Sequence, residues 1–278
     1  MKTIIQSSIV LACVLLFCDC NKPGSPAPAA GTAACQLQTE STTLSGNAAT
    51  YEYTYGTNGR VSLIKKFIGG QYHVLQDSAV VGDYTVAHYG KSTIGLPLVI
   101  TTVYNKSMFD DFPTECKIAI QEGAVTKVNQ FHYFFFYDTK NRLSKIGEQT
   151  DLVVGDYEYD LSIIYNDHDN VTGLKYELTT GPNTITTIPA SGYDDKPNPF
   201  AGVQKWYFFM HAAWNNYDPE PVFTALSKNN PLGYVDGAYT RTMTYSYNDK
   251  GFPTVRNNTN TIAGSSASFT ESFNYLCK

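Results

Sequence analysis

The stretch that decides the fold is Phe135-Phe136-Tyr137-Asp138-Thr139-Lys140-Asn141-Arg142-Leu143. It has the spacing of a β-hairpin. Apolar residues lead up to a tyrosine, and they resume after a short polar segment. An Asx side chain directly after the tyrosine can accept hydrogen bonds from the backbone two residues on and open a type I turn. The fourth position after the tyrosine needs a left-handed backbone, which Asn, Gly and sometimes Asp tolerate.

Three other segments share this frame: Tyr53 to Val61, Ile163 to Val171 and Tyr245 to Pro253. In each, Asp, Asn or Gly follows the tyrosine at once, and Gly, Asn or Asp stands four residues after it. The recurrence predicts a series of hairpins. The fourth return strand begins with Pro253, which has no N–H to donate and therefore suits an edge.

Residue alternation predicts which side of each strand is buried. Tyr51, Tyr53 and Tyr55 share one face, and Glu52 and Thr54 share the other. Such strands are half-buried, as in an antiparallel sheet with one wet face.

Two other strands carry their own signals. The segment from Tyr133 to Tyr137 is apolar on both faces, which predicts a central strand covered on both sides. Phe269, Phe273, Tyr275 and Cys277 recur at even spacing and predict the inner face of the last strand.

The composition favours a folded β-rich chain. Of the 278 residues, 14% are aromatic and only 16% are charged, so the chain has ample apolar surface to bury. A net charge of −5 without a basic run gives no basis for binding nucleic acid. We expect a mainly β fold: an antiparallel sheet of successive hairpins in a single domain over residues 35–278.

The N-terminus reads as an export signal. Lys2 precedes a mostly apolar run from Ile4 to Phe17, which is too short to cross about 30 Å of hydrocarbon as a helix. Residues 1–20 are therefore predicted to be a signal peptide ending in a lipoprotein-type cysteine. The preferred lipid attachment site is Cys20, with Cys18 as the second choice.

Two alternatives stay open for the processing of this region. Cys13 has the best small residue before it, but its preceding apolar run is very short. Ordinary cleavage near Ala29 would leave no lipid. Residues 21–34 are small, Pro-rich and without an apolar period, and they predict a flexible tether with a reach of roughly 20 Å.

Three cysteines remain beyond the tether: Cys35, Cys116 and Cys277. Export implies an oxidising compartment, and a Cys35–Cys277 disulfide would join the first and last strands. Chain-entropy arguments give an upper value of roughly 5 kcal/mol for closing so long a loop. Cys116 would then be a buried free thiol. The three cysteines have no metal-binding spacing.

At its hairpins the chain resembles tyrosine–aspartate (YD) repeats and a family of uncharacterised Bacteroidota lipoproteins. The resemblance extends to Tyr193-Asp-Asp-Lys-Pro-Asn-Pro-Phe200, to Ser227-Lys-Asn-Asn-Pro231 and to the ending Tyr275-Leu-Cys-Lys278. It implies a β-rich lipoprotein at the surface or in the periplasm, and it implies no activity.

Residues 190–235 break the strand rhythm and predict a short helical insertion. One helix is expected around Trp206 to Trp214 and another from Pro221 to Ser227. Trp206, Trp214 and Tyr207 are a possible ligand platform for sugar rings. The preferred interpretation is a helical plug covering the sheet, since dense aromatics are more often core than site.

Other candidate sites are weak. The segment Asn166 to Asn170 has oxygen ligands for a hard cation but lacks a later bidentate Glu, so a turn is preferred. Asp194 and Asp195 are adjacent carboxylates that a glycan hydrolase would require at a set separation. No catalytic, metal or cofactor motif is present in the sequence.

We therefore expect a non-enzymatic cell-envelope lipoprotein without cofactors, lipid-anchored to the outer membrane or in the periplasm. Its role would be binding or scaffolding, with a glycan or an envelope protein as partner and no nucleic acid. The main alternative is a carbohydrate-binding accessory of polysaccharide uptake. A glycan hydrolase is the least favoured alternative.

Overall fold

The computed structural model describes residues 35–44, 47–57, 61–68, 71–72, 78–82, 85–91, 96–105, 113–149, 159–178, 185–198, 200 and 219–277. These residues belong to one compact unit, Cys35–Lys278. The predicted signal peptide and tether lie outside the described residues.

The described residues contain seventeen strands and one helix, α2 (Glu220–Leu226). The strands are β1 (Cys35–Leu44), β2 (Asn47–Tyr55), β3 (Val61–Ile68), β4 (Gln71–Tyr72), β5 (Ser78–Val81), β6 (Thr85–Lys91), β7 (Pro97–Tyr104), β8 (Glu115–Glu122), β9 (Val125–Tyr137), β10 (Leu143–Gln149), β11 (Tyr159–Tyr165), β12 (Val171–Leu178), β13 (Ile185–Pro197), β14 (Asn229–Asp236), β15 (Tyr239–Tyr247), β16 (Pro253–Ile262) and β17 (Ser265–Cys277).

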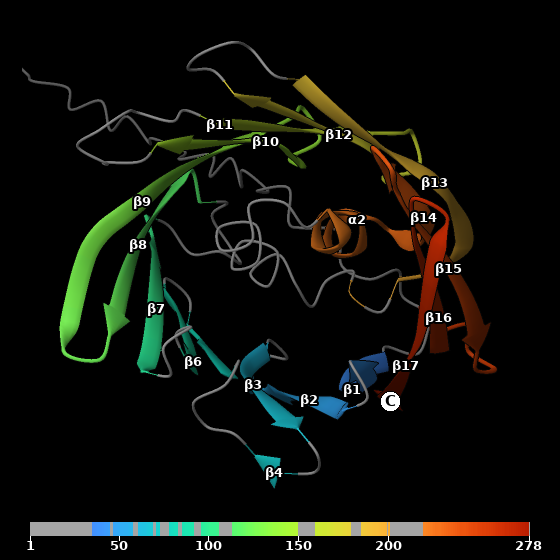
Figure 1. The fold of residues 1–278 in the computed structure, drawn as a ribbon, viewed down its shortest axis with the longest axis horizontal. Coiled ribbons are helices and arrows are strands. Elements are labelled where there is room, and N and C mark those ends of the chain that lie inside the picture. Colours follow the sequence, from blue (N-terminus) through green and yellow to red (C-terminus); the bar gives the residue numbers. More distant parts are fainter. Residues whose placement is uncertain are drawn as a thin grey trace, which may run out of the picture. The chain divides into compact units, whose positions relative to one another are not determined.

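The sheet closes on itself into an antiparallel barrel (Figure 1). Each strand pairs with its chain neighbour, and β1 pairs with β17 to complete the ring. Strands β4 and β5 both pair with β3, so together they take one position in the ring. The 17 strands of the described residues therefore form a barrel of 16 strands. The ring, its core and its closing disulfide all lie in this one unit.

The predicted antiparallel hairpins are confirmed, but the edge predicted at Pro253 is wrong. Strand β16 is paired on both sides, with β15 and with β17. Pro253 stands opposite Tyr247 at a bulge, where the ladder is locally interrupted and a missing N–H does little harm.

The predicted turn is confirmed in the three copies that the structure describes completely. Asp138, Asn166 and Asn248 each accept two backbone N–H groups, from the residues two and four positions on. The left-handed residues are Asn141, Asp169 and Gly251, with φ of 59°, 63° and 81°. Part of the first copy, residues 58–60, lies outside the described residues.

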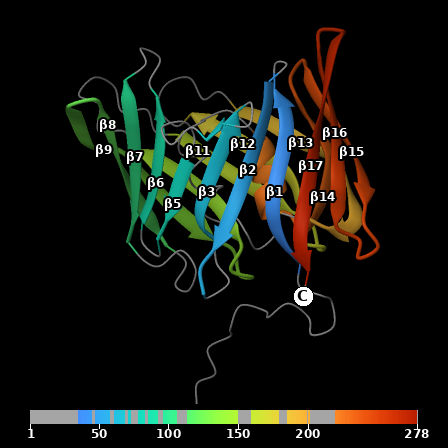
Figure 2. The ribbon, with the colours of Figure 1, turned by 90° about the horizontal axis from the view of Figure 1, so that it is seen from below.

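Tyrosines mark one end of the barrel. In an antiparallel ring every second strand runs the same way, so β2, β9, β11, β13, β15 and β17 end at one rim, seen beside the C-terminus in Figure 2. Each carries a tyrosine near its end whose hydroxyl donates to a backbone carbonyl. The pairs are Tyr55 to Leu37, Tyr137 to Pro113, Tyr165 to Leu143, Tyr193 to Val171, Tyr245 to Pro231 and Tyr275 to Pro253. We call this end the tyrosine rim.

The wall of the barrel is a single layer, which corrects one prediction. Tyr133 and Phe135 point inward and are buried, as expected. Phe136 points outward and is 50% exposed, so the strand is not covered on both sides. The outer face of a one-layer barrel has no second sheet to cover it.

The insertion is shorter than predicted. Strand β13 continues to Pro197 and β14 starts at Asn229, so the insertion comprises residues 198–228 rather than 190–235. The helix predicted from Pro221 to Ser227 is α2, and it lies inside the ring of strands (Figure 1). Its Phe223 is fully buried and stacks on Tyr234, with ring centroids 5.4 Å apart. The helix predicted over Trp206 to Trp214 lies outside the described residues.

Candidate functional site

The residues predicted to form a ligand platform and a lipid attachment site are not described. Trp206, Tyr207 and Trp214 lie outside the described residues, as do Cys18 and Cys20. These predictions stay predictions.

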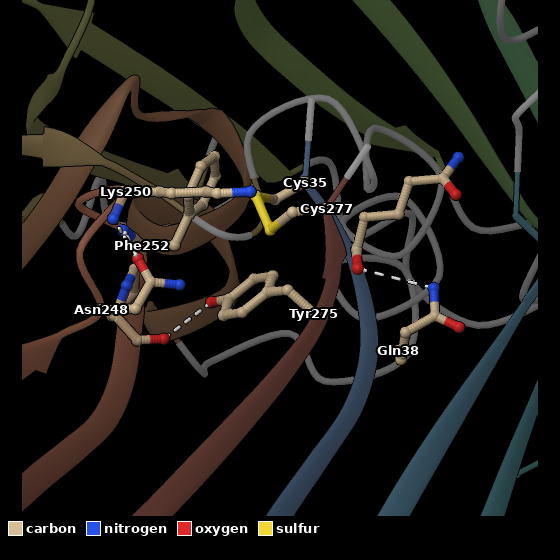
Figure 3. The surroundings of a disulfide bond; sticks show 9 residues. Cys35, Gln38, Asn248, Lys250, Phe252, Tyr275 and Cys277 are labelled. Atoms are coloured by element: carbon tan, nitrogen blue, oxygen red, sulfur yellow. Dashed lines mark hydrogen bonds between the residues drawn. A yellow bond between two sulfur atoms is a disulfide. The ribbon is translucent and has the colours of Figure 1, made fainter. Parts of the chain in front are cut away.

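A disulfide joins Cys35 and Cys277, the pairing that the sequence predicted (Figure 3). The two residues are opposite each other where β1 meets β17, so the bond staples the junction that closes the barrel. Tyr275 and Phe252 lie beside it, with ring centroids 5.4 Å apart. The disulfide therefore lies at the tyrosine rim.

Cys116 is a buried free thiol, in agreement with the sequence-based expectation. Burial raises the pKa of Cys116 far above its usual value. The nucleophilic thiolate is therefore not populated at neutral pH, and Cys116 is a core residue of β8 rather than a reactive group.

The two polar blocks in the resemblance form a clasp, made of Tyr193, Asp194, Asn198, Ser227 and Asn230. The Asn230 amide donates to the Asp194 carboxylate over 3.0 Å, and the Asn198 amide donates to the carbonyl of Ser227 over 3.0 Å. The Ser227 hydroxyl donates to the Tyr193 hydroxyl at 3.0 Å. The clasp thus ties the end of β13 to the start of β14 and fixes both ends of the insertion.

Asp194 and Asp195 do not make the carboxylate pair that a glycosidase needs. Asp194 accepts hydrogen bonds from Asn230 and from the Tyr247 hydroxyl. The Asp195 side chain is 85% exposed and forms an ion pair with the neighbouring Lys196. Successive strand residues point to opposite faces, so the two carboxylates cannot flank one bond.

The segment Asn166 to Asn170 forms a turn, as preferred from the sequence. The Asn166 side-chain oxygen accepts the backbone N–H groups of His168 and Asn170, both at 3.0 Å. The Asp169 carboxylate accepts a hydrogen bond from Arg142 at 2.8 Å. The side-chain oxygens of Asn166 and Asp169 are therefore engaged within the protein.

The most unusual group in the barrel is a buried set of charges, which we call the ionic cluster: Glu40, Glu220, Arg241, Arg256 and Glu271. The Arg256 guanidinium donates to Glu271 on β17 and, over 2.8 Å, to Glu220 on α2. Arg241 pairs with the other oxygen of Glu220. Arg256 is 3% exposed and Glu271 is 6% exposed, so these charges are shielded from water.

Two neutral side chains complete the ionic cluster. Asn258, which is fully buried, donates its amide to Glu271 over 2.6 Å. The Tyr53 hydroxyl donates to Glu40 over 2.9 Å. A buried ion pair needs such additional hydrogen bonds to offset the loss of hydration.

The carboxylates of the ionic cluster differ in proton affinity. Burial, with the nearby negative charge of Glu271, raises the pKa of Glu40 to about 7. Burial also acts on Glu271, but the charge and hydrogen bonds of Arg256 outweigh it and lower the pKa of that carboxyl. With three carboxylates and two guanidiniums, one proton on Glu40 makes the set electrically neutral.

The arrangement of the ionic cluster supports a structural role. Its groups come from β1, β15, β16 and β17 of the wall and from α2 of the insertion, so it holds the helix against the wall. In the part of the chain that the structure describes, no group of His, Cys, Asp and Glu residues is placed to hold a metal ion.

Sequence reasoning missed this cluster although one signal was available. The alternation that puts Phe269 and Phe273 inward puts Glu271 inward as well. Arg256 and Asn258 likewise alternate inward on β16.

The outer face of β15 to β17 is polar. On β15 to β17 the outward residues are Thr242, Thr244, Asn257, Thr259, Ser268, Thr270 and Ser272. They pair with each other across strands, as between Thr259 and Ser268 at 3.0 Å. Elsewhere the outer face carries ion pairs such as Lys145 with Asp160.

The outer band of a membrane-spanning barrel is apolar and about 25 Å tall, whereas β15 to β17 are polar on their outer face. No helix among the described residues is long and apolar enough to cross a bilayer.

Comparison with known proteins gives a fold and no family. No protein-family model matches the sequence, and no curated protein matches it either. Among solved structures the chain is similar to a porin-like protein from Bacteroides uniformis ATCC 8492, with a TM-score of 0.55 and 16% sequence identity. The match covers 89% of this chain and 99% of the other. At this identity the likeness concerns the fold alone.

Proposed function

We propose that this chain is a lipid-anchored protein of the bacterial cell envelope, in the outer membrane or periplasm, whose barrel stands in water. In this proposal the barrel acts as a binding or scaffolding module rather than as a pore. The observation that carries it is the outer face of β15 to β17 and the Lys145–Asp160 ion pair, where polar and charged groups occupy positions that lipid would require to be apolar.

The helix inside the ring also supports a role other than conduction. Barrels of 16 to 18 strands normally leave an aqueous channel. Here α2 lies inside the ring, its Val222 and Phe223 are buried, and Arg256 is sealed against Glu220. Such an interior resembles a protein core more than a channel.

Membrane fractionation tests the proposal. In the wild type we expect the protein in the membrane fraction, and in the Cys18→Ser/Cys20→Ser variant we expect it in the soluble periplasmic fraction. The reason is that the polar barrel contributes no membrane span of its own. A doubly substituted protein that stayed with the membrane through an alkaline carbonate wash would overturn the proposal, because it would behave as an integrated barrel.

A carbohydrate-binding accessory protein is the second candidate. The uncharged hydroxyl and amide face of β15 to β17 favours it, since sugars are bound through such groups and through aromatic rings. A glycan array probed with the full chain, with Trp206→Ala and with Trp214→Ala tests the predicted platform. Loss of binding in a folded variant would locate the sugar site at these rings, whereas no binding to any glycan would leave a protein partner as the ligand.

A further inference from the structure

A belt of exposed apolar side chains encircles one half of the tyrosine rim. Strands β5, β7, β9, β11 and β17 all run toward this rim, and the penultimate residue of each is a large apolar side chain. The five residues are Val80, Val103, Phe136, Ile164 and Leu276. Each is between 46% and 50% exposed. We call these residues the apolar belt.

The apolar belt points outward rather than into the core. Its members alternate with inward residues at the strand ends, such as the buried Val81, Tyr104 and Ile163. The other strands that end here do not continue the belt, because β2 has Thr54 and β15 has Ser246 at the penultimate position. The belt therefore follows the side of the barrel from β5 to β11, with Leu276 at the closing junction.

Cations accompany the apolar belt on the outer wall. The Lys145 ammonium lies 5.5 Å from the centre of the Phe136 ring and also pairs with Asp160. Lys117 is exposed and stands opposite Val103 in the strand register. Aromatic and aliphatic side chains mixed with lysines are typical of surfaces that lie in a membrane interface.

The chain enters the barrel at this same rim. Cys35 begins β1 and is bonded to Cys277 at the end of β17, so the segment that precedes Cys35 leaves from the tyrosine rim. A lipid at Cys20 with a tether of roughly 20 Å would keep this rim, and not the opposite one, within reach of the bilayer.

We propose that the apolar belt of the tyrosine rim docks on the surface of the lipid bilayer to which the chain is anchored. The proposal rests on the anchor proposed above. Docking removes half-exposed side chains from water, and the tether raises the local concentration of lipid so that weak contacts suffice. The barrel would then lie against the membrane in one orientation, with its polar wall and opposite rim presented to partners.

The test uses the chain from Asn21 onward, which includes the tether and the barrel but no lipid. Its binding is measured by co-sedimentation with vesicles of phosphatidylethanolamine and phosphatidylglycerol. We expect the wild-type chain to bind weakly and Val103→Ser/Phe136→Ser to bind at least about fivefold more weakly, because two anchoring side chains are lost.

A matched control comes from the opposite rim, where Val125 and Ile262 are 60% and 56% exposed. The Val125→Ser/Ile262→Ser variant should bind the vesicles as the wild type does. Thermal melting must show that all variants are folded. No vesicle binding by the wild type, or equal losses in the two variants, would overturn the docking proposal and favour a protein partner for the belt. Since this chain has no lipid, that result is independent of the fractionation experiment on the anchor.

Discussion

The interior of the barrel has two unlike halves that are built by the same alternation. On β6 to β11 most inward residues are apolar, as with Val86, Ile118 and Phe135, although Thr102 and Glu148 are buried there too. On β15 to β17 and β1 the inward positions include the ionic cluster, whose Arg256 is as well buried as the core around it. Alternation decides which residues face inward, but it does not decide whether they are apolar.

The difference teaches how each half holds the structure. Apolar contacts are non-directional and are lost in proportion to the atoms removed. A buried charge network depends on every partner, because removal of one leaves another charge unpaired in a poorly hydrated site. The ionic half is also where α2 is fastened, through Glu220, so its loss should affect the insertion as well as the wall.

The largest effect is expected from Arg256→Ala in the ionic half. The substitution leaves Glu271 buried without its main partner, and it should lower the free energy of unfolding by about 3–5 kcal/mol. Urea unfolding followed by circular dichroism measures this loss. The double variant Arg256→Met/Glu271→Leu should recover most of it. A single-variant loss below about 1 kcal/mol would mean that the charges are hydrated and that the two halves do not differ in this way.

The apolar half should respond more gradually. Ile118 is 1% exposed, and Ile118→Ala should lower the free energy of unfolding by about 2–4 kcal/mol through lost burial and a residual cavity. Ile118→Val should cost only about 1 kcal/mol. The same urea titrations apply, and the dependence of stability on urea concentration should not change. Equal costs for both variants would contradict a graded, volume-dependent response.

Much of the wall could be predicted from the sequence because its signals are local. An Asx side chain after a tyrosine and a left-handed residue four positions on define a turn whatever lies far away, and Asp138 with Asn141 does so here. The position of α2 followed from Pro221 near its first turn. The disulfide followed from the oxidising compartment and from cysteines at both ends of the domain.

The rest depends on contacts between distant parts of the chain. Closure of the barrel is a pairing of β1 with β17, and only the cysteine pair hinted at it. From the sequence alone Glu271 suggests a solvent-exposed position, because its burial depends on the hydrogen bonds that Arg256 and Asn258 donate to it. The predicted insertion is too long because the prolines and glycines of β13 and β14 hide the strand pattern in the sequence. The clasp holds these strands in place.

The pH dependence of stability should report the proton that the ionic half holds on Glu40. The pKa of Glu40 is about 7 in the folded barrel and near the ordinary value when unfolded. The folded state therefore binds the extra proton between these values, so this contribution to stability is present at pH 4.5 and is lost as the pH rises to about 7. With partial solvent screening we expect a loss on the order of 1–2 kcal/mol.

Glu40→Gln is the matched variant for this experiment. It should make the fall in stability between pH 5 and 8 less steep, since the amide cannot ionise, while Glu148, whose pKa is also raised by burial, keeps part of the slope. The apolar-half variant Ile118→Val should keep the wild-type profile at a lower level. A Glu40→Gln profile that falls as steeply as the wild type would assign the proton to another group.

The smallest effect is expected at the tyrosine rim, and it should be equal for both halves. Tyr165 ends β11 on the apolar side, and Tyr275 lies on β17 on the ionic side, yet both hydroxyls donate to a carbonyl, at 2.9 Å and 2.8 Å. Tyr165→Phe and Tyr275→Phe should each lower the free energy of unfolding by about 1 kcal/mol, the worth of one hydrogen bond.

The double variant decides whether the rim is independent of the interior. If each hydroxyl acts only on its own pair of strands, the two losses measured by urea unfolding should add. A loss for Tyr275→Phe well above that for Tyr165→Phe would mean that the rim bond and the ionic cluster stabilise each other. The difference in stabilisation between the two halves would then extend to the tyrosine rim. The reason would be that a tyrosine on β17 helps to keep Glu40 and Glu271 away from water.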